Sequence, residues 1–166
     1  MIMNITKNAL TAGACRQIIW RGCILGKLFE TWHTVEQYSA GVEVKRMFIG
    51  RYIKDILKHL NLPNTASVEL LRYGTGSGNE LHIDNQGPHK IGKEITNAVW
   101  SQTGVILLNT DFEGGVLAFP KQRAKFSKES CGDLIIFPAG KGSVNFSHTV
   151  STITIGTRYS LVIRFL

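Results

Sequence analysis

The segment Leu81-His82-Ile83-Asp84 places a histidine and an aspartate two residues apart. Successive side chains of a strand point to opposite faces, so His82 and Asp84 are predicted to point the same way from one short strand. In residues 144–150 apolar and polar side chains alternate, and His148 falls on the apolar register. This pattern predicts that His148 also points inward, where it can meet the other two side chains.

Two imidazoles and one carboxylate on one side of a metal, with the other positions open, form the facial triad of non-haem Fe(II) oxygenases. The sequence therefore predicts that His82, Asp84 and His148 hold Fe(II). A His-x-Asp pair alone is more often an ordinary strand-end pair with a local hydrogen bond. The histidine on the inward register, together with the pair Arg158 and Ser160 further along the chain, favours a metal site.

Arg158 follows His148 in the chain, and Ser160 lies at the same strand parity as Arg158. A guanidinium group binds both oxygens of a carboxylate at once, and a hydroxyl beside it adds a further donor. A metal triad with a carboxylate receptor nearby predicts a co-substrate that chelates the metal at one end and carries an acid at the other. This description fits 2-oxoglutarate.

The order of these motifs resembles the Fe(II)/2-oxoglutarate-dependent dioxygenase superfamily, in particular its prolyl-4-hydroxylase-like branch. Besides the triad, the matching stretches are Arg72-Tyr73-Gly74 and the segments 9–19, 105–109, 113–120, 132–138 and 156–161. The resemblance extends over nearly the whole chain. It implies a hydroxylase that acts on an unactivated C–H bond and releases succinate and CO2, with ascorbate as a reductant.

The resemblance also implies roles for single residues. Tyr73 stands where a tyrosine of the family lines the 2-oxoglutarate pocket, and Arg158 with Ser160 stands where the far carboxylate is bound. Members with collagen-type substrates usually carry lysine where this chain has Arg158, so the resemblance does not point to a collagen-like substrate. Asn85, Arg72 and Trp100 are further candidates to face the substrate or to support the metal ligands.

Helical spacing of apolar residues predicts a first helix within residues 9–30, with Thr11 as its N-cap, and a second amphipathic helix over 51–60. From residue 66 onward the spacing of the apolar residues changes towards a period of two residues, which is typical of strands. Strands are expected over 67–73, 103–109, 116–119, 133–137, 144–150 and 157–165. The polar segment 85–100 is expected to be a loop that forms part of the substrate entrance.

These elements predict an α+β, mainly β fold: a double-stranded β-helix, or jelly roll, with N-terminal helices packed on the outside of one sheet. We expect a single domain over 1–166, with helical support from 1–64 and the jelly-roll core over 65–166. On the final strand, Tyr159, Leu161, Ile163 and Phe165 share one apolar face, which the helices are expected to cover. Trp20 and Trp32 are expected in the core or in helix packing.

The composition, the start of the chain and the cysteines indicate a compartment and exclude some partners. Of the residues, 43% are hydrophobic, and no apolar run approaches the roughly 20 residues that a membrane span needs. The start of the chain lacks the features of a signal peptide, and Cys15, Cys23 and Cys131 form no metal-type pair. We therefore expect reduced thiols, a cytoplasmic location and no membrane partner. The sequence does not indicate the oligomeric state.

Two substrate classes and one alternative without catalysis remain open. A prolyl residue in a protein or peptide is the first expectation, by resemblance. A nucleic-acid base is the second, supported by the net charge of +7 and the basic cluster between Lys121 and Lys128. The alternative without catalysis is a jelly-roll binding module that binds its partner without metal-dependent turnover.

Overall fold

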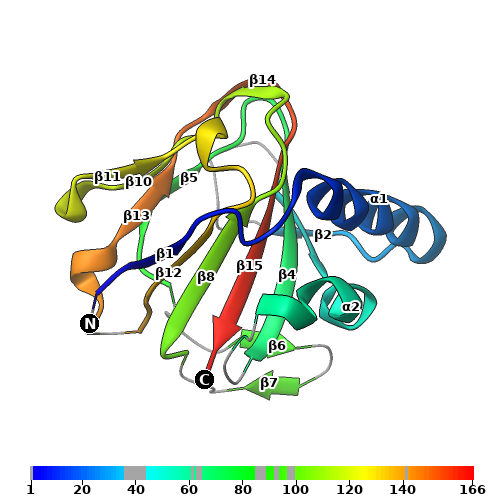
Figure 1. Cartoon of the computed structure of the whole chain (residues 1–166), viewed down its shortest axis with the longest axis horizontal. Helices are drawn as coiled ribbons and strands as arrows, with labels where there is room; N and C mark the ends of the chain where they lie inside the picture. The colour runs from blue at the N-terminus through cyan, green and yellow to red at the C-terminus, as the bar shows by residue number, and fades with distance from the viewer. Residues whose placement is uncertain are drawn as a thin grey trace.

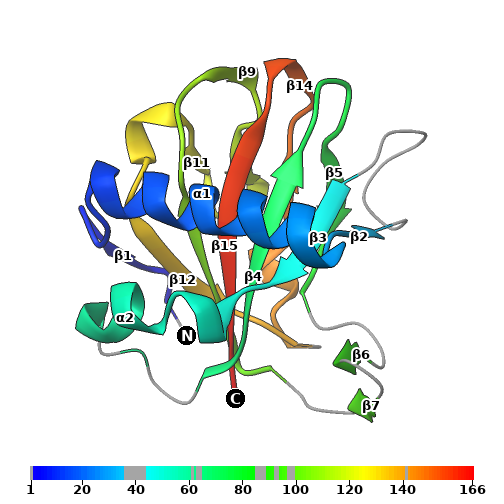
Figure 2. The same cartoon turned by 90° about the vertical axis from the view of Figure 1, so that its right-hand side faces the viewer.

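The computed structural model describes residues 2–35, 44–60, 62, 65–84, 89–91, 94–96, 100–140 and 142–166. Two antiparallel sheets face each other, and the N-terminal helices lie across the outside of the larger one (Figures 1 and 2). This arrangement confirms the predicted fold class, a mainly β double-stranded β-helix with N-terminal helical cover.

The larger sheet has seven strands in the order β1-β12-β8-β15-β4-β3-β2, and the smaller has four in the order β11-β10-β13-β5. The strands of the larger sheet are β1 (Asn4–Thr6), β12 (Leu134–Pro138), β8 (Gln102–Leu107), β15 (Arg158–Phe165), β4 (Thr65–Tyr73), β3 (Val44–Phe48) and β2 (His33–Val35). Those of the smaller sheet are β11 (Ala124–Phe126), β10 (Leu117–Phe119), β13 (His148–Val150) and β5 (Asn79–His82). Two further antiparallel pairs are β9 (Phe112–Gly114) with β14 (Ile153–Gly156), and β6 (His89–Ile91) with β7 (Glu94–Thr96).

Strand β15 lies between β4 and β8 and determines which side chains face each layer. Because side chains alternate along a strand, one face of β15 is apolar and carries Leu161, Ile163 and Phe165. These three side chains pack in the core beneath the helices, as predicted. The other face of β15 looks into the space between the sheets and carries Arg158, Ser160, Val162 and Arg164.

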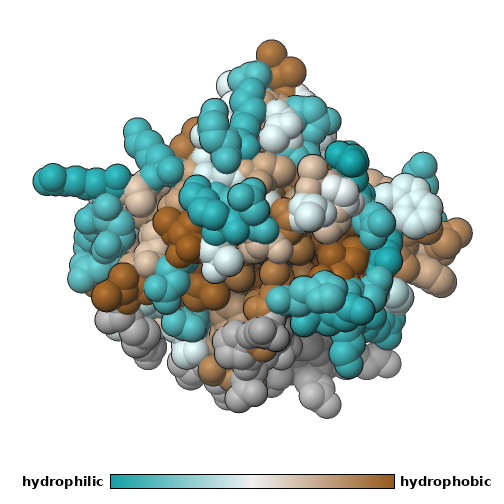
Figure 3. All heavy atoms as spheres, in the orientation of Figure 1, coloured by the Kyte–Doolittle hydropathy of each residue, from teal (hydrophilic) through white to brown (hydrophobic). Residues whose placement is uncertain are grey.

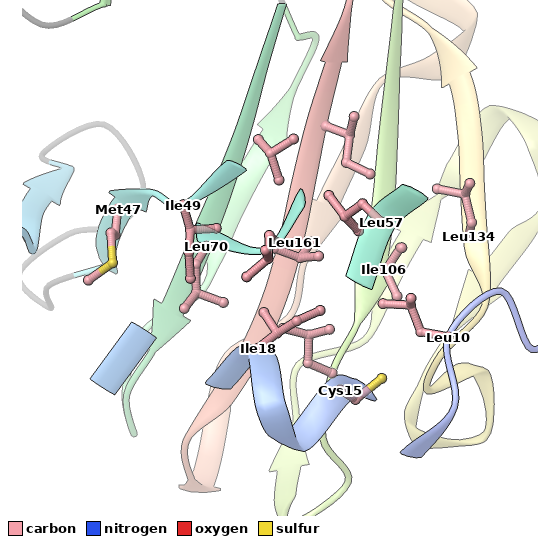
Figure 4. Close-up of a cluster of buried hydrophobic side chains, with 14 of the residues drawn as sticks. Leu10, Cys15, Ile18, Met47, Ile49, Leu57, Leu70, Ile106, Leu134 and Leu161 are labelled. Atoms are coloured by element: carbon pink, nitrogen blue, oxygen red, sulfur yellow. The ribbon is translucent and has the colours of Figure 1, made fainter. Parts of the chain in front are cut away.

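Helix α1 (Ala12–Phe29) begins as predicted, with Thr11 as its N-cap: the Thr11 side chain accepts a hydrogen bond from the Ala14 backbone N–H at 3.2 Å. The helix continues through two glycines because they lie on its packed side. A Cβ atom at Gly22 would lie 2.3 Å from Leu70 Cδ2, and one at Gly26 would clash with the Trp32 ring. Glycine therefore allows the close approach of helix and sheet that Figure 4 shows around Ile18 and Leu70.

The predicted helix over 51–60 is wrong in part. The chain instead forms a 3-10 turn (Gly50–Tyr52), a four-residue helix α2 (Lys54–Leu57) and another 3-10 turn (Lys58–Leu60). The apolar residues Ile49, Ile53 and Leu57 are buried all the same, so their spacing serves packing rather than a continuous helix. Residues 1–64 also supply strands β1, β2 and β3, so they do more than provide helical support.

Two further expectations are wrong. Val144–Phe146 form a 3-10 turn rather than a strand, and Val144 is 49% exposed. Trp20 is 64% exposed, whereas Trp32 packs against the outer core as expected.

Exposed apolar side chains also gather at the far end of α1, to the right in Figure 3, where Leu28 and Phe29 lie. No helix within the described part of the chain is both long and apolar enough to cross a membrane.

Candidate metal and co-substrate site

The two histidines are brought together by strand pairing in the smaller sheet. Strands β13 and β5 are antiparallel neighbours, and His148 is the register partner of His82. Strand β5 ends at His82, so Asp84 lies just beyond the strand rather than on it. The Asp84 carbonyl accepts a hydrogen bond from the Gly140 N–H at 3.0 Å, which fixes the chain at this point.

The three predicted ligands converge. Their ligand atoms all lie within 4.8 Å of one another. Asp84 Oδ1 is 3.6 Å from His82 Nε2 and 3.9 Å from His148 Nε2. The same carboxylate oxygen therefore faces both imidazoles, which is the arrangement that a facial triad requires.

Backbone carbonyls determine which ring nitrogen of each histidine is available. The Phe146 carbonyl lies 3.1 Å from His148 Nδ1, and the Glu80 carbonyl lies 2.7 Å from His82 Nδ1. A carbonyl only accepts, so both Nδ1 atoms carry a proton and both Nε2 atoms face the centre of the triad. The donor set thus fits Fe(II): two imidazole nitrogens and one carboxylate oxygen. The Asn79 amide lies 3.3 Å from His82 Nε2.

The surroundings of His148 keep it neutral. Its ring packs against Phe137 and Phe119, with centroids at 4.8 and 5.1 Å. Burial lowers the pKa of His148 to about 4, although Asp84 acts in the opposite direction. A neutral imidazole is the form that binds a metal, so His148 is ready to act as a ligand at neutral pH.

Arg164 was not predicted from the sequence, but it contacts the metal triad. Its Nη1 lies 2.5 Å from Asp84 Oδ2 and donates to Thr103 Oγ1 at 2.8 Å. Burial alone would raise the pKa of the Asp84 carboxyl, but the Arg164 guanidinium and the two histidines hold it well below its usual value. Asp84 is therefore an anion, with Oδ2 held by Arg164 and Oδ1 directed at the histidines.

Arg158 differs from Arg164 in its partners. It is buried, it donates to Ser160 Oγ at 3.1 Å, and its guanidinium lies 5.2 Å from the centre of the Tyr73 ring. Burial lowers the pKa of Arg158. Within the described residues it has no carboxylate partner, and its Nε has no hydrogen-bond partner. A buried guanidinium in this state can receive an anionic group.

One cavity joins the two groups of residues. It lies between the two sheets, and its empty space, open solvent included, is about 370 Å³. Its lining includes the triad, Arg158, Ser160 and Tyr73, that is, all six residues predicted for the site, together with Asn79 and Arg164, which were not predicted. The parity of Arg164 with Arg158 on β15 was a signal for its direction, but its ion pair with Asp84 was not readable from the sequence.

The other candidates lie elsewhere. The expectation that Arg72 faces the substrate is wrong. Arg72 is exposed and lies on the face of β4 opposite to Leu71 and Tyr73, which line the cavity. Trp100 is buried but does not line the cavity. Asn85 lies outside the described residues. In the segment 85–100 the backbone of β6 and β7 forms an antiparallel pair, so part of the expected loop is a hairpin.

We compared the fold and the site with those of known proteins. The chain has the double-stranded β-helix fold of 2-oxoglutarate- and Fe(II)-dependent oxygenases, with a His-Asp-His triad between its sheets. No protein-family model matches the chain. No curated protein matches it by sequence.

Solved structures match over nearly the full chain. A viral collagen prolyl hydroxylase from Paramecium Bursaria Chlorella virus-1, in complex with 2-oxoglutarate, has a TM-score of 0.68 at 16% identity; the match covers 100% of this chain and 97% of that one. A prolyl-4-hydroxylase from Pseudomonas putida has a TM-score of 0.64 at 16% identity, with 98% and 91% covered. A prolyl hydroxylase from Trichoplax adhaerens, in complex with a peptide fragment of the hypoxia inducible factor, has a TM-score of 0.68 at 15% identity, with 99% and 83% covered.

Proposed function

We propose that the protein is an Fe(II)- and 2-oxoglutarate-dependent dioxygenase that hydroxylates an unactivated C–H bond. The observation that supports this proposal is the content of one cavity. It combines a His-Asp-His triad, whose ligand atoms lie within 4.8 Å of one another, with a buried arginine that has no carboxylate partner among the described residues. A metal site alone fits many functions, and so does an arginine alone. The combination fits a metal-chelating dicarboxylate.

In this proposal each residue has one task. His82, Asp84 and His148 would hold Fe(II) on one face and leave its other positions open. Arg158 and Ser160 would bind the far carboxylate of 2-oxoglutarate, with Tyr73 as the neighbouring wall. Iron and 2-oxoglutarate, when bound, supply the oxidising chemistry that the side chains lack. The Phe119 and Phe137 rings pack against the His148 ring and form an apolar wall beside it.

The proposed substrate is a prolyl residue in a protein or peptide. The support is the likeness to prolyl hydroxylases, one of which was solved with a bound peptide fragment. At 15–16% identity this likeness concerns the fold, so the substrate is a proposal. The role of ascorbate and the cytoplasmic location likewise stay predictions.

A nucleic-acid base is the second candidate substrate. Lys121, Arg123 and Lys125 are exposed around the β10–β11 hairpin and form no ion pair within the described part of the chain. Hydrophilic side chains protrude over this hairpin at the left of Figure 3. Strand β10 pairs with β13, the strand of His148, so the basic edge belongs to the same sheet as the triad. Exposed cations without partners are suited to phosphate contacts.

Anaerobic reconstitution with Fe(II) and 2-oxoglutarate tests the proposal. We expect a visible charge-transfer absorption band that His148→Ala abolishes and that Arg158→Met weakens. The matched control is His59→Ala, because His59 is exposed in the outer 3-10 turn. Bound iron without such a band in the wild-type protein would contradict 2-oxoglutarate chelation. Failure to bind iron would favour the binding module without catalysis.

A further inference from the structure

A second charged pair lies beside the cavity and has no part in the proposed metal or co-substrate site. Glu69 on β4 and Arg46 on β3 occupy the inner face of the larger sheet. Arg46 is the register partner of Leu71, and Glu69 is the register partner of Val162; both partners line the cavity. Neighbouring strands are roughly 5 Å apart, so the pair lies one strand spacing from the cavity wall.

The Glu69 carboxylate is buried, yet the described residues satisfy it incompletely. Its side chain is only 8% exposed, and its hydrogen-bond donor among these residues is the Ser67 hydroxyl at 3.3 Å. The nearest guanidinium nitrogen, Arg46 Nη1, lies at 3.7 Å, which is beyond hydrogen-bond distance. A buried carboxylate normally accepts several hydrogen bonds, so Glu69 retains capacity for a further donor.

Arg46 has the complementary capacity. Its side chain is 29% exposed, so it reaches the surface, while its buried Nε has no hydrogen-bond partner among the described residues. The guanidinium lies 5.4 Å from the centre of the Phe48 ring. The pair therefore offers acceptor atoms, donor atoms and an aromatic surface within one small area.

We infer that Arg46 and Glu69 bind an amide group of the substrate, the main-chain amide of a peptide beside the reacting residue. A cationic group would be repelled by Arg46, and an anionic group by Glu69. A neutral amide satisfies both, since its N–H donates to the carboxylate while its carbonyl accepts from the guanidinium. Its planar face also suits Phe48. This inference rests on the proposed function, because it adds the recognition of the chain that the metal site would hydroxylate.

The test measures peptide binding to protein that holds Mn(II) and 2-oxoglutarate without oxygen, so that no turnover occurs. A panel of short proline-containing peptides is compared on wild-type protein, Glu69→Gln, Arg46→Met and the matched control Arg72→Met. Arg72 lies on the opposite face of the sheet and is exposed. We expect about tenfold weaker binding or more in the first two variants, as loss of a charge-assisted hydrogen bond predicts, and no change in the control.

Two further measurements separate recognition from folding. Affinity for 2-oxoglutarate should be unchanged in Glu69→Gln. A peptide N-methylated at the contacted amide should bind wild-type protein weakly and lose nothing more in Glu69→Gln, because the same hydrogen bond is already absent.

Three outcomes would overturn the inference. In the first, peptides bind all four proteins equally. In the second, 2-oxoglutarate binds but no peptide of the panel does. In the third, a single-stranded oligonucleotide binds in place of the peptides. Failure of 2-oxoglutarate itself to bind is a different result, because it refutes the proposed function.

Discussion

The outer face of the seven-stranded sheet is a closed apolar core, whereas its inner face holds buried charges that the described residues neutralise only in part. Leu161 and Ile163 point outward from β15 into the layer beneath α1. Arg158 and Arg164 point inward from the same strand into the cavity. One strand thus serves stability on one side and chemistry on the other, and the side-chain alternation of the strand separates the two.

The two arginines of the inner face also differ from each other. Arg164 is neutralised by Asp84 at 2.5 Å, whereas Arg158 has a hydroxyl and an aromatic ring as its neighbours. The cost of burying an unpaired guanidinium is large, so such a residue is retained where a ligand supplies the missing anion. The comparison assigns Arg158 to ligand binding and Arg164 to support of the metal ligand.

Arg158→Met removes the cation that we assign to the co-substrate. We expect the dissociation constant for 2-oxoglutarate to rise at least about 100-fold, because truncating one partner of a buried charge pair costs about 2–5 kcal/mol. Metal affinity without co-substrate should stay within a few-fold of wild type. Calorimetric titration of metal-loaded protein measures both. Equal losses of metal and 2-oxoglutarate affinity would contradict the separation of the two arginines.

Ile18→Ala tests the outer face. Ile18 is fully buried between α1 and the sheet, and truncation of such a side chain typically costs about 2–5 kcal/mol. Trp20→Ala on the exposed side of the same helix should stay within about 0.5 kcal/mol of wild type. Denaturant unfolding of both variants measures the difference. A large loss in Trp20→Ala would show that its ring is covered in solution.

Local patterns predicted the parts of the fold in which one face is consistently buried. The spacing of apolar residues such as Ala14, Ile18 and Leu25 and the cap at Thr11 indicated α1, and the alternation of β15 indicated both of its faces. The metal ligands were readable because imidazole and carboxylate are rare together on an inward register.

Pairing over long distances was not readable. Residues 44–48 form a strand because β4 offers hydrogen bonds on that edge, although their apolar spacing also suits a helix. Phe146 is buried from a 3-10 turn, so an alternating pattern did not require a strand. The ion pair of Arg164 with Asp84 depends on two segments that meet only in the folded chain, and no local spacing predicts such a meeting.

Arg164→Met leaves the Asp84 carboxylate without its cation and frees Oδ2. We expect metal affinity to fall about 10–100-fold, the usual effect of losing a group that orients a metal ligand. Arg164→Lys should recover part of the loss, and Arg72→Met should match wild type. Competition between the protein and a metal-binding dye measures affinity without any turnover. Unchanged affinity in Arg164→Met would mean that the pair serves folding alone.

Acid titration of the metal-free protein gives the smallest effect and tests the neutral state of His148. The pKa of His148 is about 4 in the folded protein, whereas its ordinary value is 6.5. Between these two pH values the unfolded chain therefore binds one proton more than the folded chain. Unfolding is therefore favoured as the pH falls through this window, and about 2 kcal/mol of stability is lost between about pH 7 and pH 5. The lowered pKa of Asp84 adds a loss in the same direction, but only below its ordinary value of 3.8.

His148→Gln should remove the pH dependence of stability between the folded and the ordinary pKa of His148, while the loss at lower pH remains. An unchanged slope in His148→Gln would assign the dependence to another group and would mean that the Phe119 and Phe137 rings do not keep His148 neutral.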